Sequence, residues 1–220
     1  KLEGHSAGAS EKKLNAYVAT GISSCHEPIT ADEVLDRLRL GLHVMVREGS
    51  IRRDLETIAA IKDYGIDCRR IILASDGIEP GELLENGYME FIVQKAINCG
   101  FEPVTAIQMA TLNTAEHFRV ARDLGQISPG RYADILLVSD LQNFQAELVI
   151  SKGQVIAKDG ELLVDLPSYE YPSWAIQSVH LGKKLTADDF RIPANGSKLT
   201  ANVIGVIENQ APTEHLRMEV

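Results

Sequence analysis

The feature that most constrains the fold is the alternation of helical patterns with short apolar runs from residue 10 to about residue 112. Apolar residues recur at helical spacing in the longer segments, and the shorter runs between them have the length of buried strands. Chains in which helices and strands alternate in this way form βα units around a parallel sheet. We therefore predict an α/β fold for this part of the chain.

The expected elements follow one another closely. Strands are predicted at 22–25, 43–46 and 70–74, and helices at 10–20, 31–42, 88–98 and 103–111, with another helix around Leu55, Ile58 and Ile61 and one more starting at Asn113 or Thr114. The order Thr30-Ala31-Asp32-Glu33 predicts a capping box. Ser50 is predicted to cap the helix that follows it.

After Gly125 the pattern changes to glycine-rich turns around short β-rich runs at 133–138, 146–151 and 154–157, which predicts a small sheet. Residues 166–172 contain two prolines and two tyrosines with little periodicity, as a linker does. Apolar stretches at 201–207 and 215–220 indicate a third region. We predict domains at 1–124, 125–166 and 167–220.

Composition argues against nucleic acid as a partner and against a membrane or secreted protein. A net charge of -9 with no basic run opposes binding to nucleic acid. The three cysteines are widely spaced without a CxxC pattern, which fits reduced thiols. No apolar run approaches the roughly 20 residues of a membrane span, and the first residues lack the apolar core of a signal peptide. We expect a cytoplasmic protein.

Three candidate metal ligands, His5, His26 and Asp76, each follow a short apolar stretch. In a parallel β/α barrel the carboxyl ends of all strands face one mouth, so these residues would converge there. Imidazole and carboxylate suit zinc, iron or manganese, and such an ion lowers the pKa of a bound water to near neutrality. The pattern predicts metal-assisted hydrolysis.

Each candidate also has a plainer interpretation. His5 fits an ordinary surface histidine, and Asp76 with Gly77 fits a simple turn. Arg47 and Glu48 follow a strand-like run and would reach the same mouth as substrate-binding residues, or they would lie in an exposed loop. Cys25 fits a buried small apolar residue better than a nucleophile. The other histidines are interpreted as structural: His43, His117, His180 and His215.

Two segments, 109–118 and 124–135, resemble the closing part of enzymes of the amidohydrolase superfamily. The second segment contains Gly125, Ile127, Gly130, Ala133 and Asp134 in the order Gly-x-Ile-x-x-Gly-x-x-Ala-Asp. In that superfamily this turn begins strands that return to a β-sandwich after the barrel. The resemblance implies the same order of domains here.

Within the superfamily the chain resembles most the family of bacterial adenine deaminases. The likeness runs through the following segments: 4–5, 14–17, 26–27, 38–41, 44–50, 75–76, 189–193 and 203–206. It implies that His5, His26 and Asp76 bind metal, that Asp76 takes a proton from water, and that Glu27 has an acid/base or second-metal role. The implied reaction converts adenine to hypoxanthine and ammonia. The implied metal is manganese or iron, with zinc also compatible.

The chain departs from the family pattern in two ways. Gly77 stands where the family often has a second acid, and the His-x-His pair and fourth-strand ligand are missing. We therefore expect an internal fragment: the C-terminal half of a metal-dependent (β/α)8 barrel, part of a small β-sandwich and the start of an α+β domain. We expect the fragment alone to be inactive and its exposed edges to favour a homo-oligomer. Another cyclic amidine or amide as substrate, or a non-catalytic assembly subunit, are the alternatives.

Overall fold

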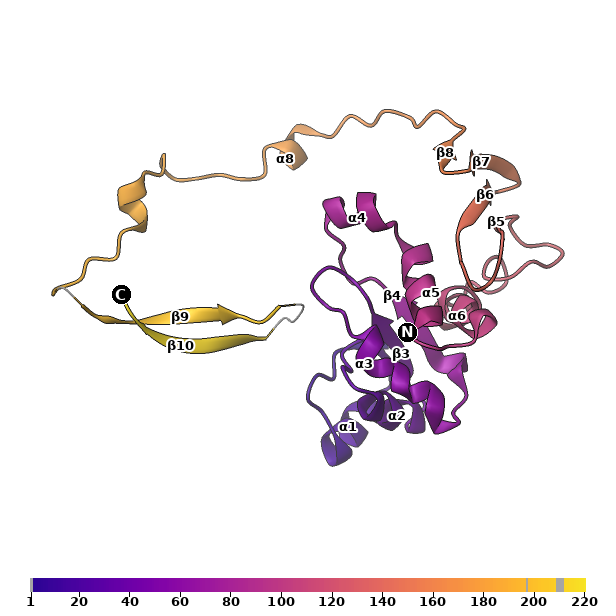
Figure 1. Cartoon of the computed structure of the whole chain (residues 1–220), viewed down its shortest axis with the longest axis horizontal. Coiled ribbons are helices and arrows are strands. Elements are labelled where there is room, and N and C mark those ends of the chain that lie inside the picture. Colours follow the sequence, from indigo (N-terminus) through magenta and orange to yellow (C-terminus); the bar gives the residue numbers. More distant parts are fainter. Residues whose placement is uncertain (1, 197, 209–211) are drawn as a thin grey trace. The chain divides into compact units, whose positions relative to one another are not determined.

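The computed structural model describes residues 2–196, 198–208 and 212–220. The chain divides into two compact units. The first unit reaches Leu163, and the second covers residues 164–207 and 212–220. Figure 1 shows the first unit in indigo to orange and the second in orange to yellow.

The first unit is built on a parallel sheet. Its four strands, in the order β1-β2-β3-β4, are β1 (Leu2–Gly4), β2 (Ile22–Cys25), β3 (His43–Arg47) and β4 (Ile71–Ala74). The connections contain α1 (Glu11–Val18), α2 (Ala31–Arg39), α3 (Leu55–Ile58) and 3-10 turns at Ala59–Tyr64 and Cys68–Arg70. Successive strands are neighbours and parallel, as in repeated βα units. The predicted α/β fold is confirmed.

Four further helices follow β4: α4 (Pro80–Asn86), α5 (Met89–Asn98), α6 (Pro103–Ala110) and α7 (Leu112–Phe118). Both α4 and α6 begin with proline, which needs no hydrogen-bond acceptor for its nitrogen in the first turn. The sequence interpretation did not include α4. Helices α5, α6 and α7 contact β4.

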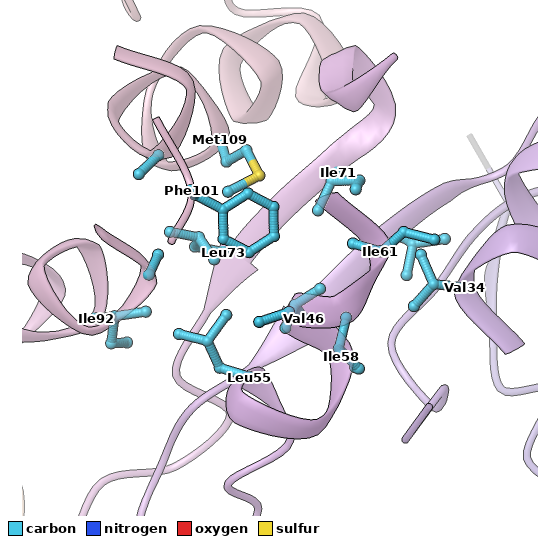
Figure 2. Packing of buried hydrophobic residues seen from close by; sticks show 14 of the residues in the cluster. Val34, Val46, Leu55, Ile58, Ile61, Ile71, Leu73, Ile92, Phe101 and Met109 are labelled. Carbon is cyan, nitrogen blue, oxygen red and sulfur yellow. The ribbon is translucent and has the colours of Figure 1, made fainter. Parts of the chain in front are cut away.

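The apolar core lies between the sheet and these helices. Figure 2 shows Val46 and Leu73 from the strands facing Ile58, Phe101 and Met109 from the surrounding elements. All five side chains are buried. Burial of such side chains contributes about 1.5–3 kcal/mol each, so this cluster accounts for much of the first unit's stability.

The starts of α2 and α3 differ in part from those predicted. The Thr30 hydroxyl accepts from the Glu33 amide (3.3 Å), as predicted, but the Glu33 carboxylate accepts from the Ile29 amide (2.8 Å), one residue before the cap. The prediction that Ser50 caps the next helix is wrong. Asp54 precedes α3, and the Ser50 hydroxyl accepts instead from the Glu79 amide (2.7 Å).

The remaining strands of the first unit form an antiparallel sheet of β5 (Ile135–Val138), β6 (Ala146–Ser151), β7 (Gln154–Lys158) and β8 (Glu161–Leu162). Gln94 of α5 holds the segment between β5 and β6: its side chain accepts from the Phe144 amide (2.5 Å) and donates to the Gln142 carbonyl (2.9 Å). The predicted strands are confirmed. Their place in a sandwich, and the boundary near residue 124, stay predictions.

The second unit contains little regular structure before its end. It has a short helix, α8 (Ser173–Ile176), a 3-10 turn at Ala187–Phe190, and a hairpin of β9 (Thr200–Val206) and β10 (Thr213–Glu219). Residues of β10 are exposed along the whole strand. Among the described residues of both units, no helix has the length and apolar character needed to cross a membrane.

Candidate metal centre

Two neighbouring strand ends bring His5, His26 and Glu27 together. β1 and β2 run parallel with Gly4 opposite Cys25, so the residues that follow each strand emerge at the same edge of the sheet. Glu27 Oε1 lies 3.0 Å from His5 Nδ1 and 3.4 Å from His26 Nε2. The two imidazole rings meet edge to face, with centroids 4.2 Å apart.

The three side chains differ in exposure. Glu27 is 10% exposed, His26 30% and His5 70%. Burial lowers the pKa of His26, and the nearby His5 lowers it further. The neutral imidazole that this favours is the form that binds metal ions.

Arg47 connects this group to the end of β4. Its Nη1 lies 3.1 Å from Glu27 Oε1 and 3.1 Å from Asp76 Oδ2, and its Nη2 lies 3.3 Å from Asp54 Oδ2. Burial raises the pKa of Asp54, and the Arg47 guanidinium acts in the opposite direction. One buried cation therefore links carboxylates from three connecting segments.

The structure brings the predicted ligands to one edge but groups them unequally. Ligand atoms of His5, His26 and Glu27 all lie within 4.8 Å of one another, close enough to hold one metal ion. Asp76 is adjacent through Arg47 and is half exposed. Glu27, predicted to have an acid/base or second-metal role, is thus the carboxylate that lies against the two histidines.

Glu48 and Arg47 are buried, so the interpretation of this segment as an exposed loop is wrong. Glu48 Oε1 accepts from Lys95 Nζ at 2.7 Å, while its Oε2 has no hydrogen-bond partner among the described residues. Both side chains are engaged in ion pairs. Their contact with a substrate stays a prediction.

Backbone contacts fix the turn that carries Asp76. The Glu48 amide donates to the Ala74 carbonyl (2.8 Å), and the Ser50 amide donates to the Gly77 carbonyl (3.1 Å). A Cβ atom on Gly49 would lie 2.2 Å from the Ser75 carbonyl oxygen. Gly77 has φ +88°, where other residues are strained, so a backbone requirement accounts for glycine at this position.

Sequence reasoning missed the buried polar residues behind the site, Arg37, Ser6 and Asp54, and the partly exposed Lys95. One signal was available: Arg37 lies three residues after Val34 on the apolar face of the predicted helix. Cys25 is buried, as predicted. His117 is buried near His43, with ring centroids 4.5 Å apart, and Glu3 lies 3.3 Å from it.

Comparison with known proteins identifies the family of this chain. Residues 2–156 match the model of the Amidohydrolase family. The chain belongs to that family. Membership implies a divalent metal ion, and the two imidazoles and one carboxylate grouped at the sheet edge are a donor set that such ions accept. The residues present therefore fit the implied ion.

Curated relatives are adenine deaminases. The protein from Roseobacter denitrificans is 46% identical over 207 residues, which are 93% of this chain and 34% of that protein. The one from Moorella thermoacetica is 44% identical over 223 residues, covering 100% of this chain and 37% of that protein. The chain thus spans about a third of the length of these relatives.

Solved structures show the same fold at low identity. A β-aspartyl dipeptidase from Fervidobacterium islandicum has a TM-score of 0.55 and 17% identity, over 76% of this chain and 49% of that one. Molinate hydrolase has a TM-score of 0.51 and 19% identity, over 78% of this chain and 46% of that one. These likenesses concern the fold alone.

Proposed function

We propose that this chain is part of an adenine deaminase that hydrolyses adenine to hypoxanthine and ammonia with the help of a divalent metal ion. One observation carries the proposal: His5, His26 and Glu27 meet at adjacent ends of parallel strands in a chain that matches adenine deaminases along nearly all its length. A purine is then the small-molecule substrate, and a homo-oligomer remains part of the proposal.

The proposal includes the arrangement of domains. Residues 1–124 form the C-terminal half of a (β/α)8 barrel, residues 125–166 contribute strands to a β-sandwich, and residues 167–220 are a linker and the start of a further domain. The four consecutive parallel strands and the separate antiparallel sheet support this division. The extra length of the relatives leaves room for the other barrel strands.

His5 and His26 hold the ion in this proposal, with Glu27 or Asp76 as the carboxylate ligand. Glu27 lies against both imidazoles, which favours it as the ligand. Asp76 is half exposed, which favours it as the group that takes a proton from the attacking water. A bound manganese, iron or zinc ion would make that water more acidic and stabilise negative charge near it.

Where Asp76 is the carboxylate ligand instead, Glu27 has an acid/base role in this proposal: it takes a proton from the attacking water and passes it to the purine ring. Its carboxylate oxygen is held by Arg47 at 3.1 Å, so its direction is fixed before substrate arrives. A fixed carboxyl group saves the reorganisation that proton transfer otherwise requires. Arg47 thereby places both carboxylates on the same side of the site.

The test is metal analysis and an adenine assay on a protein as long as the curated relatives, with His26→Ala compared against His180→Ala. His180 lies in the second unit, away from the β1–β2 strand ends in sequence. We expect His26→Ala to lose bound metal and at least about 100-fold in activity, because a ligand is removed. Equal metal content and activity in the two variants would overturn the proposal, and turnover only of another cyclic amidine would correct the substrate.

A further inference from the structure

We propose that Arg37 is a positioning residue of the metal centre, which sets the spacing of His5 and Glu27 through Ser6 and Cys25. The inference rests on the proposed metal centre and adds to it a residue behind the ligands. It starts from the burial of a charged side chain that no part of the proposed chemistry uses.

Arg37 is a buried cation without a described counter-ion. It belongs to α2 and is 1% exposed. Its guanidinium donates to the carbonyl oxygens of Ser6 (2.7 Å), Glu33 (2.9 Å) and Ala9 (3.4 Å), and its Nε donates to the Ser6 hydroxyl (3.0 Å). Removing a guanidinium from water is costly, and neutral carbonyls compensate less than a carboxylate does.

These bonds hold the turn that follows β1. Ser6 comes directly after His5, and the Ala9 amide donates back to the Ser6 carbonyl at 3.0 Å. β1 has only three residues and pairs with β2 on one side, so few ladder hydrogen bonds fix its end. Arg37 supplies further restraint from α2, because its guanidinium donates hydrogen bonds to the carbonyls of Ser6 and Ala9 at the two ends of the turn.

A second set of contacts runs from the same turn to Glu27. The Ser6 hydroxyl and the Cys25 thiol lie 2.9 Å apart, within hydrogen-bond distance. The Glu27 amide donates to Cys25 Sγ at 3.4 Å. These contacts form one continuous path, which runs from Arg37 through Ser6 and Cys25 to the Glu27 backbone. A displacement of Ser6 would change the separation of His5 from Glu27.

Arg39 provides a matched control on the same helix. Its side chain is exposed, and it pairs with Asp36 at 4.0 Å, one turn away. Replacing it removes the same charge from the same helix without touching the path. Methionine suits both positions, since an unbranched apolar side chain fills the space of the arginine stem.

The experiment uses a protein as long as the curated relatives. It is titrated with Co²⁺, and the visible absorption is recorded because it depends on the number and geometry of the ligands. We compare wild type, Arg37→Met and Arg39→Met, with circular dichroism as the check of folding. We expect Arg37→Met to bind Co²⁺ about 10- to 100-fold more weakly and with an altered spectrum, as loss of groups that support ligands does elsewhere. Arg39→Met should match wild type.

The outcomes separate this inference from the proposed function. Absence of Co²⁺ binding by wild type would overturn the metal centre and the role of Arg37 with it. Wild-type affinity and spectrum in a folded Arg37→Met would overturn the role of Arg37 alone. If Arg37→Met does not fold, Ser6→Ala decides: it removes one hydroxyl from the path, and an unchanged spectrum and affinity would overturn the inference.

Discussion

The two halves of the sheet edge that carries the site differ in the polar side chains that they contain and in how far these are exposed. At the ends of β1 and β2, two imidazoles share one carboxylate oxygen, and His5 is largely exposed. At the ends of β3 and β4, Arg47, Glu48 and Asp54 are buried and form ion pairs with one another or with Lys95.

This difference in burial predicts that one half of the edge contributes mainly to metal binding and the other mainly to stability. Charges that are buried and paired become costly when one partner is removed, whereas an exposed side chain contributes little to stability. We therefore expect substitutions at the β3–β4 half to lower the free energy of unfolding, and substitutions at the β1–β2 half to lower metal affinity instead.

The largest effect should come from Arg47→Met. It leaves the buried Asp54 carboxylate without its cation, which costs about 3–5 kcal/mol in comparable cases. Urea unfolding of the first unit measures the loss. Arg53→Met is the control, because Arg53 pairs with the partly exposed Glu82. Equal losses in the two variants would remove the contrast between the two halves.

The loss in Arg47→Met should depend on pH. Burial raises the pKa of Asp54, and removing Arg47 takes away an influence that lowers it. An acid whose pKa is raised by folding favours the folded state at low pH and loses that contribution as pH rises through the folded pKa. The deficit should therefore shrink on acidification, and Asp54→Asn in the Arg47→Met background should reduce it at neutral pH.

A medium effect is expected from Gly49→Ala. The added Cβ would lie 2.2 Å from the Ser75 carbonyl oxygen and 2.4 Å from that of Gly77, so the backbone on one side must move. Overpacking of this kind costs about 1–3 kcal/mol. Thermal unfolding measures it, with Gly81→Ala as control, since a Cβ there has no atom within 4 Å apart from its chain neighbours and its own helix backbone. A stable Gly49→Ala would show that the Asp76 turn is not rigid.

The smallest change in stability should follow His5→Ala. The side chain is 70% exposed, so we expect the free energy of unfolding to stay within about 0.5 kcal/mol of wild type. Co²⁺ affinity should nevertheless fall, because one of the three proposed ligands is gone. A marked loss of stability without loss of Co²⁺ binding would reverse the roles assigned to the two halves.

Much of the fold could be predicted from periodicity alone. The strand at 22–25 and the strand at 146–151 have the predicted limits, because Gly21 precedes the first and the turn at Gly153 follows the second. Helix α4 was missed, since none of its residues is buried and its sequence shows no apolar face. The role of Ser50 was predicted wrongly because the sequence does not show which amide its hydroxyl accepts from. That amide belongs to Glu79 and not to the helix that follows Ser50.

Only part of the site could be predicted from the sequence, because sequence spacing does not give the direction of a side chain. His5 and His26 could be paired because each follows a strand of one parallel sheet. The group around Arg47 depends on side-chain directions at three strand ends, and sequence spacing does not fix these. Arg37 is the harder case: its role depends on carbonyl oxygens about 30 residues earlier, and any residue type presents such oxygens.

β1 lies at the outer border of its sheet, and His5 is the next residue along the chain. The backbone groups on its open side are a template for pairing with a further strand. A second polypeptide that docked there would set the depth at which this imidazole lies. Uptake of an ion at His5 would then depend on what pairs with this border of the sheet.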